Sequence, residues 1–267
     1  MQLNLAEFIE TAEHDRNNPY VIDYLLKARN QPTLGDVLQA VDGCMFAGKT
    51  FQIDEERRLF IQAGRHVLVF SPSLDDRDAA HTVCHVNRQK EIVGPEDERS
   101  LEGKIKIPAI KVPRNNPKLI VYFTVGYILS KNNLPVVMID EYQFFTREIV
   151  NVSKVLFRVL GLSHFVYSLN EDFERRPMGF ISEIISMGEC NHIRAKAICS
   201  RCGKLHAATN SVKIVEDGKI EDIGGLNKYL PYCTKCRYAE GRIDHVRCEF
   251  DELELVEENR PIHIHAR

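Results

Sequence analysis

Four cysteines and one glycine-rich loop are the residues whose types and spacing could do chemistry in this chain of 267 residues. The cysteines form two CxxC pairs, Cys199 with Cys202 and Cys233 with Cys236. Four thiolates satisfy tetrahedral Zn²⁺, and a CxxC turn lets two sulfurs converge on one ion. Because the ligand set is complete, we expect a structural zinc with no open catalytic position. Redox-active cysteines are the weaker alternative.

The glycine-rich loop has the form G-x-x-x-x-G-K-T. Its backbone N–H groups can turn inward on phosphates, Lys49 can reach the β- and γ-oxygens, and the Thr50 hydroxyl suits Mg²⁺. The pattern predicts a site for ATP and magnesium. That site comprises Gly43, Cys44, Met45, Phe46, Ala47, Gly48, Lys49 and Thr50.

The segments on either side of this loop fit the motif. Residues 36–41 are predicted to form a short strand. Thr50–Arg65 is predicted to form a helix, with Leu59, Phe60 and Ile61 on or near its buried side. Strand, loop and helix in this order are the arrangement that a phosphate-binding loop requires.

Two acids end a later apolar strand, Val136–Asp140 followed by Glu141. A carboxylate at such a strand end can hold Mg²⁺, which prefers hard oxygen ligands, and Asp140 is the candidate for this role. Glu141 would then project toward the acceptor, where it could act as general base. The alternative is that the acidic pair only caps the strand in solvent.

Arg77 follows the preceding predicted strand, in the segment SPSLDDR. This segment should open onto the ligand-binding edge of the sheet, where Arg77 could neutralise charge on the transferring phosphoryl group. A surface arginine paired with Asp75 or Asp76 is an equally good interpretation.

Strand-like and helix-like segments alternate along the chain, which predicts a largely parallel sheet covered by helices. Further strands are expected over His66–Ser71 and His164–Leu169, and a helix over Arg147–Gly161. Residues 94–118 are assigned to a loop or an edge element, and Leu119–Leu129 to a helix. The fold class is therefore α/β.

The composition limits the classes of function. Lys plus Arg number 35 against 38 Asp plus Glu, so a nucleic-acid partner is not supported. The first residues lack the pattern of a secretory signal, and the longest apolar stretch is shorter than the ~20 residues that span a bilayer. Scattered cysteines, one of them inside the phosphate loop, fit a reducing compartment. We therefore expect a cytoplasmic protein without a membrane segment.

These motifs, taken in order, resemble the type II thymidine kinase family. The resemblance runs from about Gly35 to Tyr238. Its residues are GCMFAGKT, SPSLDDR, IDEYQFF, SLNEDFERRP, AICSRCG and EDIGGLNKY leading into PYCTKC.

The resemblance implies a RecA-like kinase core, a small zinc-ribbon "lasso" domain that closes over the nucleoside, and usually a homotetramer. It suggests a division into an N-terminal extension (1–34), a kinase core (35–195), a zinc-binding lasso domain (196–238) and a C-terminal extension (239–267). It implies an enzyme that phosphorylates thymidine or a related pyrimidine deoxynucleoside at the 5′-hydroxyl, in the supply of DNA precursors, with ATP as donor and with Mg²⁺ and structural Zn²⁺.

The resemblance also implies residue roles. Glu141 would be the base on the 5′-hydroxyl, and Lys49, Thr50 and Arg77 would attend the phosphates and Mg²⁺. Without it, the apolar positions around the nucleoside would be interpreted as plain core. The implied nucleoside-binding residues are Met45, Asp75, Phe144, Leu169, Phe173, Thr209, Ile220, Asp222 and Tyr229.

Tyr142, Asn170, Met178 and Asp222 depart from the usual pattern of the family. One methyl group separates thymidine from deoxyuridine and contributes only about 1–3 kcal/mol in a pocket, so modest repacking could redirect the base preference. Because Asp222 stands where an aliphatic residue normally faces the nucleoside, we hypothesise tolerance of polar 5-substituents.

Two other classes of function compete with a nucleoside kinase. One is a phosphate-loop ATPase that switches conformation and whose zinc module binds nucleic acid or a protein partner. The other is a catalytically silent regulator, which the intact Lys49, Thr50, Asp140 and Glu141 argue against.

Overall fold

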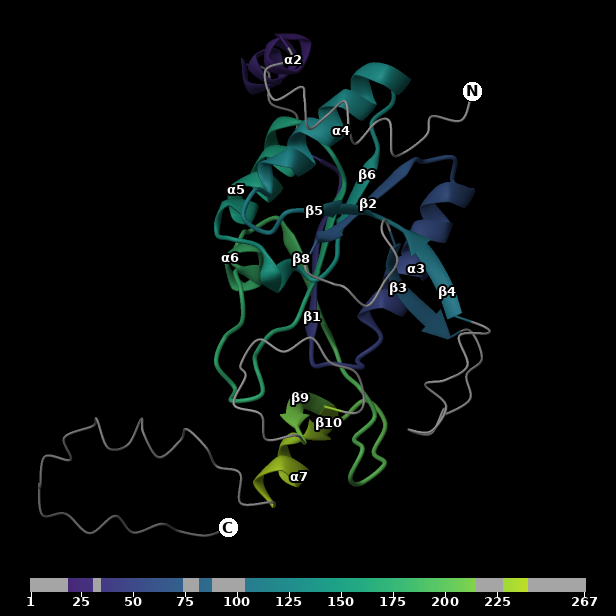
Figure 1. The fold of residues 1–267 in the computed structure, drawn as a ribbon, viewed down its shortest axis with the longest axis vertical. Coiled ribbons are helices and arrows are strands. Elements are labelled where there is room, and N and C mark those ends of the chain that lie inside the picture. Colours follow the sequence, from purple (N-terminus) through teal and green to yellow (C-terminus); the bar gives the residue numbers. More distant parts are fainter. Residues whose placement is uncertain (1–18, 31–34, 74–81, 88–103, 215–227, 240–267) are drawn as a thin grey trace, which may run out of the picture.

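A six-stranded sheet forms the centre of the computed structural model, which describes residues 19–30, 35–73, 82–87, 104–214 and 228–239 (Figure 1). The strand order is β5-β2-β6-β7-β1-β8, and every neighbouring pair is parallel. The parallel sheet predicted from the alternating segments is confirmed. Its strands are β1 (Leu38–Gly43), β2 (Val67–Pro72), β5 (Ile110–Val112), β6 (Val136–Ile139), β7 (His164–Ser168) and β8 (Cys190–Ala195).

Helices cover both faces of the sheet, which explains why the central strand β6 is apolar at every position. Val137 and Ile139 face one core cluster, and Val136 and Met138 face the other. In Figure 1, α4 and α5 lie over one face and α3 over the other. The helices of the first face are α2 (Pro19–Asn30), α4 (Lys118–Lys131), α5 (Glu148–Lys154) and α6 (Ile181–Ile185).

The helix after the phosphate loop, α3 (Lys49–Gln62), confirms the element predicted over 50–65, and of its predicted buried side only Phe60 is confirmed. Ile53 is fully buried, whereas Leu59 is 64% and Ile61 49% exposed. Phe60 comes seven residues after Ile53, about two turns, and so packs on the same side. Leu59 and Ile61 point about 100° away from that side, and the prediction for these two residues was wrong.

Residues 104–118, the described part of the segment predicted as a loop or an edge element, contain strands, so the edge-element alternative is confirmed there. Strands β3 (Thr82–Asn87) and β4 (Lys104–Pro108) form an antiparallel pair, and β5 is the edge strand of the main sheet. The helix predicted over 119–129 is confirmed as α4. The helix predicted over 147–161 is α5 followed by a π-helical turn at Val155–Val159.

Strand β8 was not predicted, because its side chains are mostly exposed and give no alternating pattern. It lies at the sheet edge beside β1, where the buried Asp42 carboxylate accepts hydrogen bonds from His192 Nε2 (2.9 Å) and Arg194 Nη2 (2.9 Å). Its place in the sheet is therefore fixed by contacts with a strand about 150 residues earlier in the chain.

The remaining described elements gather at the lower end of Figure 1. Strands β9 (Ala208–Lys213) and β10 (Tyr229–Cys233) form an antiparallel pair, followed by helix α7 (Thr234–Tyr238). Of the described helices, none has both the length and the apolar character needed to cross a membrane.

Candidate active site and metal centre

The phosphate loop joins the end of β1 to the start of α3, as the sequence predicted. At Gly43 the strand end lies so close to β8 that a Cβ would stand 2.3 Å from the Ala195 carbonyl oxygen, so only glycine fits. Gly48 adopts the left-handed conformation (φ 80°) directly before the helix. These two glycines let the backbone wrap tightly in front of the first turn of α3.

Lys49 is the charged group at the centre of this loop. Its ammonium donates to the carbonyl oxygens of Gly43 (3.1 Å) and Cys44 (2.9 Å). Burial lowers the pKa of Lys49, and the Glu141 carboxylate is the strongest of the nearby charges that oppose this, with Asp140 also contributing. In the folded protein, the phosphate loop and the two predicted acids are therefore close enough for their charges to interact.

Helix α3 is held against the sheet by the carboxylate of Glu56. Its two oxygens accept from Tyr167 (2.5 Å), Gln39 (3.0 Å) and Gln52 (2.7 Å). Burial raises the pKa of Tyr167, and the neighbouring Glu56 adds to this, so the phenol stays a donor. This cluster fixes the helix, and with it the phosphate loop, relative to β1 and β7.

Asp140 and Glu141 follow β6 directly, at the carboxyl end of the sheet. Asp140 is buried, and its Oδ1 accepts the backbone N–H of Glu141 at 2.8 Å. Glu141 has a positive φ of 50°, a left-handed conformation that a residue with a side chain adopts at a cost of about 1–3 kcal/mol. Such a conformation persists only where the surroundings fix it.

Gln143 is the residue that fixes the carboxylate of Glu141. Its Oε1 accepts from the backbone N–H of Leu169 (3.0 Å), which sets the orientation of the amide. Its Nε2 therefore faces Glu141 and donates to Oε2 at 2.5 Å. A Cβ on Gly179 (φ 64°) would lie only 2.4 Å from Gln143 Cα. The backbone of the loop between β7 and α6, residues 169–180, therefore packs directly against this glutamine.

Tyr142, which lies between these two residues, points into the core rather than outward. Its buried hydroxyl donates to Ser153 Oγ (3.1 Å), whose own proton is directed to Nε2 of His164 (3.0 Å). This direction follows because His164 Nδ1 lies 3.1 Å from the Val137 carbonyl oxygen, which can only accept. Burial lowers the pKa of His164 to about 4 and raises that of Tyr142, so both side chains are neutral near pH 7.

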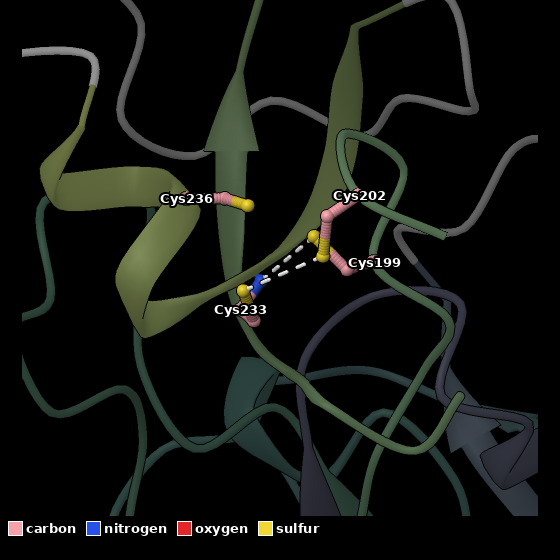
Figure 2. Close-up of side chains that lie close together, drawn as sticks. All are labelled: Cys199, Cys202, Cys233 and Cys236. Atoms are coloured by element: carbon pink, nitrogen blue, oxygen red, sulfur yellow. Dashed lines mark hydrogen bonds between the residues drawn. The ribbon is translucent and has the colours of Figure 1, made fainter. Parts of the chain in front are cut away.

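The four predicted metal ligands converge at one point (Figure 2). Cys199 and Cys202 come from a turn before β9, and Cys233 and Cys236 from the end of β10 and from α7. All four sulfurs lie within 4.8 Å of one another, and Cys202 Sγ is 3.9 Å from Cys233 Sγ. A tetrahedral ion with Zn–S bonds of about 2.3 Å requires sulfurs about 3.8 Å apart. The thiols can therefore hold a metal ion such as zinc.

The four thiols alter one another's protonation. Burial raises the pKa of Cys199, but the backbone N–H groups of Cys233, Cys202 and Arg201 outweigh it and lower this pKa to about 6. Hydrogen bonds with the other cysteines, Cys233 first, raise the pKa of Cys236 to about 12. Four thiolates at this spacing need a positive charge between them.

We call the turn with Cys199 and Cys202, together with β9, β10 and α7, the zinc-binding module. It touches the phosphate loop directly. The Met45 N–H donates to Ser211 Oγ on β9 (2.9 Å), and the Cys44 thiol donates to the Ala208 carbonyl oxygen (3.3 Å). Cys44 is fully buried among residues of the module, including Cys199.

The module also contacts the β7–α6 loop. Arg237 donates to the carbonyl oxygen of Phe173 at 2.7 Å. The ammonium of Lys213 lies 5.2 Å from the centre of the Phe173 ring, and Lys213 pairs with Tyr229 across β9 and β10. Two of the predicted nucleoside-binding residues, Phe173 and Tyr229, are thus placed around Lys213.

The other predicted nucleoside-binding residues have different surroundings. Phe144 is half-buried in the short 3₁₀ helix Tyr142–Phe144, and the backbone of Leu169 bonds to Gln143. The Thr209 hydroxyl accepts from the Asn210 amide (3.1 Å) inside the zinc-binding module. Asp75, Arg77, Ile220 and Asp222 lie outside the described residues.

Sequence reasoning missed Gln143, Ser211 and Arg237. Gln143 stands two residues after Glu141, and that proximity was an available signal. Ser211 and Arg237 gave no such signal in the sequence, because their partners Met45 and Phe173 lie 166 and 64 residues away in the chain.

Comparison with known proteins identifies relatives of this chain. The family model described as thymidine kinase matches residues 92–237, more than half of the chain. A thymidine kinase of Mesomycoplasma hyopneumoniae (strain 7448) is 28% identical over 200 residues, which cover 75% of this chain and 94% of that protein. A thymidine kinase of Pseudothermotoga lettingae is 27% identical over 200 residues, covering 74% of this chain and 93% of that protein.

Proposed function

This chain belongs to the thymidine kinase family, and from that premise we propose that it transfers the γ-phosphoryl group of ATP to the 5′-hydroxyl of thymidine or a related pyrimidine deoxynucleoside. The product would be the nucleoside monophosphate, a precursor for DNA synthesis. The proposal is carried by the placement of Lys49, in the phosphate loop after β1, near enough to Glu141 and Asp140 after β6 for their charges to oppose the lowering of its pKa by burial. It supports a donor site and an acceptor site that share one edge of the sheet.

In the proposed reaction Glu141 accepts the proton of the 5′-hydroxyl as the oxygen attacks the γ-phosphorus. The bond between that phosphorus and the β,γ-bridging oxygen breaks, and ADP leaves. Lys49 and the N–H groups of the phosphate loop hold the transferring group and its negative charge. Most of the catalysis in such a site comes from positioning and charge neutralisation. The hydrogen bond from Gln143 keeps the Glu141 carboxylate in the required direction.

The donor set supports two metal ions of different kinds. Asp140 and Thr50 would hold Mg²⁺ with hard oxygen atoms, and that ion would neutralise charge on the phosphates. The four cysteine thiolates would hold Zn²⁺ without an open position, so its role is structural.

The nucleoside would lie between the phosphate loop, the β7–α6 loop and the zinc-binding module. Phe173 and Tyr229, around Lys213, support this location. Met45, Phe144, Leu169 and Thr209 complete the proposal together with Asp75, Arg77, Ile220 and Asp222, which lie outside the described residues.

The decisive experiment measures transfer of labelled γ-phosphate from Mg·ATP to thymidine, deoxyuridine and deoxycytidine. We expect transfer to at least one of these nucleosides, and Glu141→Gln should lower kcat by about 10²–10⁴-fold, because the glutamine has the same size but cannot accept the proton. ATP hydrolysis without any transfer to a nucleoside would contradict a kinase and favour an ATPase switch.

The same assay, extended to 5-substituted deoxyuridines, tests the proposed base preference. Asp222 motivates the expectation that 5-hydroxymethyl-deoxyuridine is turned over better than thymidine. Equal or better turnover of thymidine would rule that preference out.

A further inference from the structure

Ser211 and Arg237 connect the zinc-binding module to both halves of the proposed active site. Both residues are almost fully buried, at 4% and 2% exposure. The Ser211 hydroxyl accepts the Met45 N–H of the phosphate loop at 2.9 Å, and the Ser211 carbonyl oxygen accepts from Arg237 Nη1 at 3.4 Å. Arg237 Nη2 donates to the Phe173 carbonyl oxygen at 2.7 Å. A continuous set of contacts thus runs from the phosphate loop to the β7–α6 loop.

We propose that Ser211 and Arg237 are positioning residues, through which the zinc-binding module sets the geometry of the phosphate loop and of the loop that carries Phe173. The inference rests on the proposed function, since it assigns these two loops to ATP and to the nucleoside.

The role of Ser211 follows from how a phosphate loop works. Such a loop binds anions because its N–H groups point in fixed directions. The N–H of Met45 is directed to Ser211, and the preceding residue, Cys44, bonds to Ala208 on the same strand. Two consecutive loop residues are thereby tied to β9. The direction of the following N–H groups depends on this attachment.

The role of Arg237 follows from the shape of its side chain. A guanidinium presents several N–H groups in one plane and can bond two carbonyl oxygens from different segments, whereas a lysine ammonium is a single point charge on a flexible stem. Arg237 is the residue after Cys236, one of the four clustered thiols. A metal ion bound there fixes the backbone from which Arg237 reaches Ser211 and Phe173.

The test for Ser211 measures the binding of Mg·ADP to the full-length, zinc-loaded protein by calorimetry. Ser211→Ala should raise the Kd about tenfold, because the Met45 N–H loses its acceptor in a buried site. Ser211→Thr keeps the hydroxyl and should bind within about threefold of the wild type. Ser200→Ala, an exposed serine of the same module, is the matched control and should leave the Kd unchanged.

The outcomes of this titration separate the two proposals. An unchanged Kd for Ser211→Ala overturns the inference. A wild-type protein that does not bind Mg·ADP overturns the proposed function, and this inference with it.

The test for Arg237 compares the KM values for nucleoside and for ATP in Arg237→Lys, with zinc content measured on the same sample. We expect the nucleoside KM to rise about tenfold and more than the ATP KM, with one zinc per chain retained. A role in stability alone would lower kcat through loss of active protein and leave both KM values unchanged. That result overturns the assignment.

Discussion

Gln143 illustrates how one side chain can define a catalytic geometry. Its amide is held between an obligate donor, the Leu169 N–H, and an acceptor, the Glu141 carboxylate. Because a backbone N–H can only donate, the amide has a single orientation, and its NH₂ group is directed to Glu141. The left-handed backbone of Glu141 costs free energy and persists only where the surroundings fix it, and the hydrogen bond from Gln143 is part of those surroundings.

We expect Gln143→Ala to lower kcat for nucleoside phosphorylation by about 10- to 100-fold with little change in the KM for ATP, because a base displaced by about 1 Å loses that much rate. Steady-state kinetics with each substrate varied in turn would measure this. Gln62→Ala, at the exposed end of α3, removes a glutamine outside the site and serves as control. Equal losses in the two variants would argue against the positioning role.

His164 is buried and neutral, so its protonation is linked to unfolding. Its pKa of about 4 in the folded protein lies below the value of about 6.5 in an unfolded chain. The unfolded state therefore binds a proton that the folded state does not bind. The free energy of unfolding consequently falls as the pH falls from about 6.5 toward 4.

We predict that the wild-type protein loses about 2 kcal/mol more unfolding free energy between pH 7 and pH 5 than His164→Gln does, as measured by urea denaturation. Comparing the two proteins cancels the contributions of the other titrating groups, including the cysteines. Identical pH dependence in both would mean that the pKa of His164 is the same in the folded and the unfolded protein.

At the scale of elements, the zinc-binding module contains too little regular structure to be stable by itself. Its described part comprises the turn with Cys199 and Cys202, the two-stranded pair of β9 with β10, and the five-residue helix α7. Two strands and one helical turn are marginal in water without a further source of stability. A metal ion held by the four thiols would supply it, because metal-binding free energy becomes folding free energy for such a unit.

We expect Cys202→Ser to lose the bound metal and to lower the Tm by about 10 °C, equivalent to about 3 kcal/mol. Cys202 is exposed, so the substitution leaves no cavity in the core. Cys190→Ser, on β8 and outside the four-thiol cluster, should keep one zinc per chain. Metal analysis and a thermal melt of both variants would measure these effects. Retention of the metal by Cys202→Ser would contradict the assignment of Cys202 as a metal ligand.

At the scale of the whole molecule, helix α2 is part of the packed core of the described structure. Val21 is 6% exposed within the cluster that includes α4 residues, and Tyr24, Leu25 and Ala28 pack against it. The sequence placed this helix in an N-terminal extension of residues 1–34, and that division stays a prediction, as does the homotetramer.

We expect Val21→Ala to destabilise the protein by about 2 kcal/mol and to lower the Tm by about 4–8 °C, because buried methyl groups are lost. Ile22→Ala on the exposed side of the same helix should change the stability by less than about 0.5 kcal/mol. Thermal melts of the two variants compare both sides of α2. Similar effects would mean that α2 does not dock as described.

The sequence by itself determined where the phosphate loop, the strand-end acids and the cysteine pairs lie in the chain of elements. In each case the residues lie within a few positions of one another, so a short turn brings them together whatever the rest of the fold does. The parallel sheet followed in the same way from alternating apolar segments, whose periodicity reports local structure directly.

Only the tertiary structure decided which distant residues support that chemistry. Ser211 reaches Met45 across 166 positions, and β8 joins the sheet edge although its exposed side chains carry no strand pattern. Tyr142, one of the departures from the family pattern, is a buried core residue that is hydrogen-bonded to Ser153. Such contacts depend on the order of strands and on how loops cross the sheet edge, and the spacing of residues along a chain carries no information about either.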